Sequence, residues 1–227
     1  MFNFFKKKEK KPETSLADAL RDVIFGVAPA TEWPKGDTGE HPWLVFIEAR
    51  RHIMERQNFE EAAKLYKQIT ETPGLESRHY LQAWFFLRKM NIQPPADMAR
   101  KAYGIVVDVR LQSGPELVAC YADHTARYLH SSGGGIVWEA PDTSLNDVID
   151  ALIRAGDEVA SKVPPLENNI RPNAPQQVDA VQIGVLTPSG IHHGIGTFEG
   201  WSKDPMGSTI VNAASYLMQN LVNKKKS

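Results

Sequence analysis

Residues 105–122, IVVDVRLQSGPELVACYA, contain the pattern that determines the fold class. Apolar side chains at 105, 107, 109 and 111 alternate with the side chains between them, which is the period of two typical of a half-buried strand. Residues 113–115, Ser-Gly-Pro, predict a turn, and the apolar run at 117–122 predicts a second strand. This stretch therefore predicts two antiparallel strands.

The sequence after this pair continues with further strands and helices. It predicts strands at 125–130 and 136–139, a long helix from about 142–144 to 163, strands at 178–187 and 191–198 around a turn at 188–190, and a final helix at 208–223. Asp123 and His124 are predicted to form a two-residue hairpin turn. The order ββββαββα predicts an α+β sandwich domain over 104–223, a mostly antiparallel sheet with two helices packed on it.

The sequence before residue 104 has helical periodicity instead. Apolar residues recur every three to four positions over 16–25, 43–57, 59–72 and 76–90, and a short further helix is predicted over 96–102. Prolines and glycines predict a loop over 28–42. We therefore assign the chain to the α+β class and divide it into a disordered basic tail at 1–13, a helical region at 14–103, the α+β domain at 104–223 and a basic tail at 224–227.

The formal net charge of −1 conceals an uneven distribution of charge. Residues 1–12 contain five lysines and one glutamate, whereas 104–223 contains 6 basic and 13 acidic residues, a net charge of −7. A protein that binds DNA or RNA needs a basic surface that neutralises phosphates. We therefore expect no nucleic-acid partner for the α+β domain.

Composition narrows the class of protein further. Cys120 is the single cysteine, which excludes an intrachain disulfide and a multi-cysteine zinc or iron–sulfur site. No apolar run reaches the roughly 18 residues of a transmembrane helix, and no apolar segment followed by a small-residue cleavage site indicates a secretory signal. These patterns are typical of a cytoplasmic protein.

Phe2, Phe4 and Phe5 precede a block of lysines that starts at Lys6. Aromatic residues beside a basic cluster can rest on an anionic membrane surface, so one interpretation is a weak membrane contact and a membrane-peripheral location. The alternative is a solvated tail, which the sequence favours because a single short anchor binds a membrane weakly.

Residues 57–66, QNFEEAAKLY, resemble the turn and second helix of a tetratricopeptide repeat. Phe59, Ala62 and Tyr66 match the aromatic, small and aromatic positions of that repeat. The resemblance covers 43–72, which is one repeat, and Ala49-Arg50 depart from its usual first helix. It implies a helical hairpin rather than a repeat array, and a generic antiparallel helix pair is the alternative.

A second resemblance covers about 104–222. Residues 121–123, Tyr-Ala-Asp, residues 136–139, Ile-Val-Trp-Glu, and residues 186–190, Leu-Thr-Pro-Ser-Gly, are similar to a family of uncharacterised bacterial proteins. His124 is a departure if the hairpin turn of that family is Asp-Gly. The family has no assigned activity, so the resemblance implies none.

The sequence predicts neither a cofactor nor a metal ion. The glycines at 133–135 precede a predicted strand and lack a following Gly-Lys-Ser/Thr, so they do not form a phosphate-binding loop. His192 and His193 are adjacent on a predicted strand, so their side chains point to opposite faces and do not easily share a metal ion.

Three classes of function remain, and one of them is the membrane-peripheral protein anchored by residues 1–11. The leading prediction is a noncatalytic adaptor or regulatory protein that binds another protein or a second copy of itself, with interaction candidates Trp138, Glu139, His192 and Trp201. Trp201 lies in a loop flanked by glycine and proline, where an aromatic side chain can anchor a partner or cap the edge of the sheet.

An alternative is a hydrolase-like enzyme with a site between the helical region and the α+β domain. Its candidate residues are Asp108, Asp123, His130 and Cys120. Cys120 as a nucleophile would need a base within hydrogen-bond reach, and His130 on a neighbouring strand is the candidate for that role.

Overall fold

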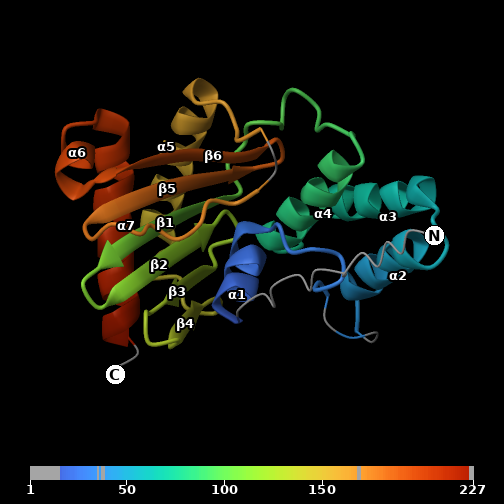
Figure 1. The fold of residues 1–227 in the computed structure, drawn as a ribbon, viewed down its shortest axis with the longest axis horizontal. Helices are drawn as coiled ribbons and strands as arrows, with labels where there is room; N and C mark the ends of the chain where they lie inside the picture. Colours follow the sequence, from blue (N-terminus) through green and yellow to red (C-terminus); the bar gives the residue numbers. More distant parts are fainter. Residues whose placement is uncertain (1–15, 35, 37–38, 168–169, 225–227) are drawn as a thin grey trace, which may run out of the picture.

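The structure, a computed structural model, describes residues 16–34, 36, 39–167 and 170–224. The predicted tail at 1–13 and residues 225–227 lie outside the described residues. The helical region contains α1 (Leu16–Phe25), α2 (Trp43–Met54), α3 (Phe59–Glu71) and α4 (Ser77–Lys89). α3 packs against α2 on one side and α4 on the other, so the predicted hairpin of helices is present (Figure 1).

The sheet contains six strands in the order β4-β3-β2-β1-β5-β6, and every pairing between neighbours is antiparallel. The strands are β1 (Gly104–Leu111), β2 (Gly114–Tyr121), β3 (Ala126–Leu129), β4 (Gly135–Trp138), β5 (Ala180–Thr187) and β6 (Gly190–Thr197). The helices among and after them are α5 (Asn146–Lys162), α6 (Phe198–Ser202) and α7 (Pro205–Lys224). The predicted α+β class, with helices before an antiparallel sheet, is confirmed.

The two faces of the sheet are covered by different parts of the chain (Figure 1). α5 and α7 lie on one face, where their apolar side chains share a core with Ile105, Val107 and Val118. The helical region covers the opposite face, where α1, α4 and the segment between α1 and α2 share a core with strand residues that include Val106, Leu117, Tyr121 and Leu186. The core packing therefore runs across the predicted boundary between residues 103 and 104.

Polar contacts also join the helical region to the sheet. The guanidinium of Arg21 on α1 donates two hydrogen bonds to the carboxylate of Asp108 on β1, and both residues are buried. Asp123, between β2 and β3, accepts a hydrogen bond of 2.6 Å from the backbone N–H of Ser77 and so caps the start of α4. Arg88 of α4 donates to the backbone carbonyl of Pro188 in the β5–β6 turn.

The prediction of a helix over 96–102 is wrong, because residues 96–100 form turns. Backbone groups of this segment bond to distant parts of the chain instead: the carbonyl of Ala99 accepts from the N–H of Ser189, and the N–H of Ala102 donates to the Asp157 carboxylate. The β2–β3 connection is also longer than the predicted two residues, because β2 ends at Tyr121 and β3 begins at Ala126. The N–H of Tyr121 bonds to the carbonyl of Thr125, and His124 adopts a positive φ of 62°.

The end of the chain differs from the prediction at its helix boundaries. β6 ends at Thr197, whose hydroxyl accepts a hydrogen bond from the N–H of Gly200 and caps the unpredicted short helix α6. α7 begins at Pro205, three residues earlier than predicted, because Asp204 accepts from the N–H groups of Met206 and Gly207. No helix in the described part of the chain is long and apolar enough to cross a membrane.

Candidate binding groove between helices α2, α3 and α4

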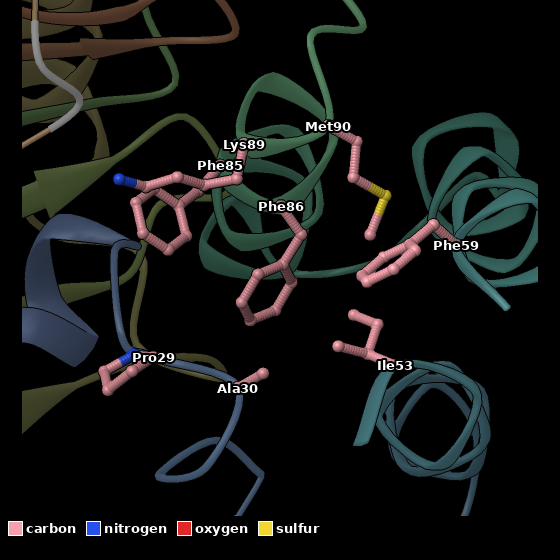
Figure 2. Close-up of a pocket in the computed structure, with 8 residues that line it drawn as sticks. All are labelled: Pro29, Ala30, Ile53, Phe59, Phe85, Phe86, Lys89 and Met90. Carbon is pink, nitrogen blue, oxygen red and sulfur yellow. The ribbon is translucent and has the colours of Figure 1, made fainter. Parts of the chain in front are cut away.

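An apolar hollow lies between α4, the α2–α3 hairpin and the segment after α1. We call it the apolar groove. It has a volume of about 550 Å³, within the range of ligand-binding sites. Figure 2 shows the residues that line it, which are Pro29, Ala30, Ile53, Phe59, Phe85, Phe86, Lys89 and Met90.

The base of the apolar groove is fixed by aromatic packing inside the helical region. Phe86 of α4 stacks on Tyr66 of α3 at a centroid distance of 4.7 Å, and Tyr66 contacts Phe46 of α2 at 6.0 Å. Ala62 on α3 is fully buried, and its small side chain lets a neighbouring helix approach closely. Phe85 and Phe86 are consequently held as a rigid floor.

One wall of the apolar groove is formed by side chains from three helices. In Figure 2, Met90 at the end of α4, Ile53 of α2 and Phe59 of α3 point toward one another. Phe59 is the first residue of α3, which Asn58 caps by accepting a hydrogen bond from the N–H of Glu61. The Phe59 side chain is 55% exposed, so it presents apolar surface to an incoming ligand.

Lys89 is the one charged residue among the eight that line the apolar groove. Its ammonium lies 5.5 Å from the centre of the Phe85 ring, over the floor of the groove. Apart from the Lys89 amine, the lining contains no hydroxyl or thiol nucleophile and no carboxyl or imidazole group. The arrangement can bind apolar side chains and offer one cation to a neighbouring carboxylate.

The four predicted interaction residues do not line the apolar groove, and they do not come together as a set. Trp138 and Glu139 belong to the β4 edge of the sheet, whereas His192 and Trp201 lie at the β6 edge. Trp138 is buried beneath the ammonium of Lys224, 4.9 Å from its ring centre. Glu139 is exposed, and its carboxylate lies 3.5 Å from the Arg127 guanidinium.

His192 is fully buried on the face that α5 covers. Its Nδ1 bonds to the carbonyl of Val163 at 2.6 Å and its Nε2 bonds to the Thr187 hydroxyl at 3.0 Å. Burial lowers the pKa of the imidazole, which favours the neutral ring. Both ring nitrogens are therefore occupied, Nδ1 by a contact to the end of α5 and Nε2 by a contact to β5.

Trp201 is a half-buried residue of α6 that packs onto three glycines. Its ring lies over Gly194 and Gly196 of β6 and against Gly207 of α7, and its indole N–H donates to the carbonyl of Val181 at 3.0 Å. We call this arrangement the glycine slot. Trp201 and His192 both line a small cavity of about 160 Å³ beside it. The placement of Trp201 matches the interpretation that it caps the edge of the sheet.

The four catalytic candidates are also dispersed. Asp108 lies on the face that α1 covers, whereas Cys120 lies on the opposite face, where burial raises the pKa of its thiol to about 12. His130 lies 3.3 Å from the Glu116 carboxylate, and Asp123 caps α4. These residues form no common site, and the described residues contain no cluster of ligating side chains that could hold a metal ion.

Sequence analysis missed the apolar groove because periodicity does not distinguish a buried apolar residue from an exposed one. Phe59 belongs to the same helical stripe as Ala62 and Tyr66, which are fully buried. The position of Phe59 in the first turn of its helix was the one sequence feature that could have indicated its exposure, because the apolar face of a helix can extend beyond the end of the helix it packs against.

Comparison of the chain with protein families, curated proteins and solved structures finds no match, so the two resemblances described above stay predictions.

Proposed function

We propose that this chain is a noncatalytic interaction protein that binds a short apolar segment of a protein partner in the apolar groove. The observation that carries the proposal is the exposure of Phe59 beside a floor of fixed aromatic rings. Exposed aromatic side chains over a rigid, apolar base are typical of the residues that contribute most to binding energy at protein interfaces.

The shape of the apolar groove favours a helical segment as its ligand. Its walls come from different helices, an arrangement that commonly accepts the apolar face of an amphipathic helix with side chains at i, i+3 or i+4, and i+7. Lys89 at the rim would pair with a carboxylate of that helix. We therefore propose a partner helix that has one apolar stripe and an acidic residue next to it.

A selection of displayed peptides against the full chain tests this proposal. We expect the enriched peptides to carry the i, i+3 or i+4, i+7 apolar pattern. Their affinity should fall about tenfold or more in Phe59→Ser, because truncation of one aromatic anchor costs about 2 kcal/mol.

Phe198→Ser is the matched control for this measurement. Phe198 is 39% exposed, and like Phe59 it is the first residue of a capped helix, but it lies outside the groove. The proposal is wrong if the selection enriches no such pattern, or if the two variants bind the enriched peptides equally.

A further inference from the structure

The first five residues contain three phenylalanines, Phe2, Phe4 and Phe5, and the proposed function does not use them. They belong to residues 1–15, which lie outside the described residues. A cluster of three aromatic side chains is strongly favoured to leave water when an apolar surface is within reach. The apolar groove offers such a surface on the same chain.

The start of α1 is close enough to the apolar groove for this segment to reach it. α1 has ten residues and a length of about 15 Å. The chain then runs from Phe25 to Pro29, a groove residue, over at most about 14 Å, so Leu16 lies within about 30 Å of the groove. Residues 6–15 can extend over about 36 Å, which places Phe5 within reach.

Three exposed carboxylates beside the apolar groove can attract the lysines that follow the phenylalanines, although Lys89 in the lining is basic and Glu60 already pairs with Lys64 at 3.4 Å. Glu32, Glu55 and Glu60 are exposed, and each lies within two residues of a residue that lines the groove. Lysines occupy positions 6, 7, 8, 10 and 11. Attraction between these exposed charges is weak and sensitive to salt, so it would orient the segment while the phenylalanines supply the affinity.

From this combination we infer that residues 2–5, Phe-Asn-Phe-Phe, occupy the apolar groove and compete there with the protein partner. The inference rests on the proposed function, because it assigns a regulatory role to the same groove. In this arrangement the phenylalanine side chains would contact Ile53, Phe59 and Met90, and the lysine block would lie near Glu55 and Glu60. The partner gains access when the segment leaves.

A spin label on the segment tests this inference in the full chain. Cys120 is buried with a pKa raised to about 12, so a cysteine introduced by Asn3→Cys is the one that reacts with a nitroxide reagent. The methyl groups of the methionines serve as the NMR probes. Met90 lines the groove, whereas Met206 and Met218 belong to α7, on the far side of the sheet (Figure 1).

We expect the nitroxide to remove the Met90 methyl signal and to leave the Met206 and Met218 signals. Two changes should restore the Met90 signal: Phe2→Ser with Phe4→Ser and Phe5→Ser on the segment, or Phe59→Ser in the groove. Phe198→Ser should leave the Met90 signal broadened, because it changes an exposed phenylalanine elsewhere.

The inference is overturned if Met90 keeps its signal in the labelled chain, or if its signal is lost equally with and without the three phenylalanines. Binding of the labelled chain to vesicles of phosphatidylglycerol and phosphatidylcholine tests whether the segment contacts a membrane surface. Binding of the labelled chain to them, with a sharp Met90 signal in their absence, would assign the segment to a membrane surface instead. A broadened Met90 signal in the labelled chain, together with no peptide binding by the Phe2→Ser, Phe4→Ser, Phe5→Ser variant, would overturn the proposed function and the competition with a partner, and would leave only the contact between residues 2–5 and the groove.

Discussion

At the scale of single residues, the Arg21–Asp108 pair is the buried polar contact on which the helical region depends most directly. Arg21 donates to both oxygens of Asp108 between α1 and β1. Asp108 was one of the four residues predicted for a hydrolase-like site. The structure shows that it neutralises a buried cation, a role that no local pattern in β1 reveals, since its partner is 87 positions away.

Asp108→Asn should lower the free energy of unfolding by about 3–5 kcal/mol, because it leaves the Arg21 guanidinium buried without a counter-charge. The double variant Arg21→Met with Asp108→Leu should recover most of the loss, since it removes both charges together. Urea unfolding of the three chains measures the effect. Equal stability of the single variant and the unchanged protein would contradict the account.

The protonation state of His79 depends on the fold. It is buried in α4 among the rings of Trp33, Trp43 and Phe46, and burial lowers its pKa to about 4. An unfolded histidine has a pKa near 6.5, so the unfolded state binds the proton first as the pH falls. The stabilisation from neutral His79 is therefore complete above about pH 6.5 and is lost toward pH 4.

The free energy of unfolding should consequently fall by roughly 2–3 kcal/mol more between pH 7 and 4.5 in the unchanged chain than in His79→Phe. Tryptophan fluorescence during urea unfolding at the two pH values provides the measurement. The comparison isolates His79, because His192 and His193, whose pKa values are also lowered by burial, are present in both chains. The same pH dependence in both chains would contradict the account.

At the scale of elements, the glycine slot determines how α6 and α7 meet the sheet. A Cβ at Gly207 would overlap the Trp201 ring, and one at Gly194 would lie 2.8 Å from it. These glycines are required because an indole ring lies directly on the backbone. The sequence shows the glycines and the tryptophan as separate features, and only the three-dimensional arrangement relates them.

Gly207→Ala should displace the Trp201 ring and lower the free energy of unfolding by about 1–3 kcal/mol, the usual effect of overpacking. Gly200→Ala is the matched control within α6, because its Cβ would find the nearest atom at 3.4 Å. Near-UV circular dichroism and urea unfolding should show a change for Gly207→Ala and little for Gly200→Ala. If both variants behave alike, the slot does not hold Trp201.

Most elements could be predicted from periodicity, and the exceptions share a physical cause. Helices α1 to α5 and α7 follow an apolar period near 3.6, and the strands follow alternating or continuous apolar runs, so the existence of these elements was predictable. The helix expected over 96–102 fails because distant groups capture its backbone. The apolar groove could not be predicted, because it depends on where α2, α3 and α4 stop covering one another.

At the scale of the whole molecule, the sheet is buried on both faces by different segments of the chain. The run at 117–122 predicted a strand, and its consecutive apolar side chains are divided between the cores on the two faces. The helical region buries the face opposite α5 and α7 with side chains that include Phe25, Leu81 and Trp84. The region and the sheet thus share one core despite the change of periodicity at residue 103.

Residues 104–224 alone should fail to form a cooperatively folded domain, because loss of the helical region uncovers Val106, Leu117, Tyr121 and Leu186. Uncovered apolar surface on a sheet promotes dye binding and aggregation. The fragment is expected to bind an anilinonaphthalene dye and to lack a sharp thermal transition, whereas the full chain unfolds in one transition. A fragment that unfolds cooperatively without dye binding would show that the two parts fold independently.

The central claim is that the apolar groove binds a protein partner and that Phe2, Phe4 and Phe5 of the same chain compete for it. The most direct test is the affinity of a selected groove peptide for the full chain and for the chain with Phe2→Ser, Phe4→Ser and Phe5→Ser. We predict that the peptide binds the triple variant about tenfold more tightly, because a groove that is mostly closed lowers the apparent affinity by its open fraction. Equal affinity for the two chains, unchanged by Phe59→Ser, would contradict the claim.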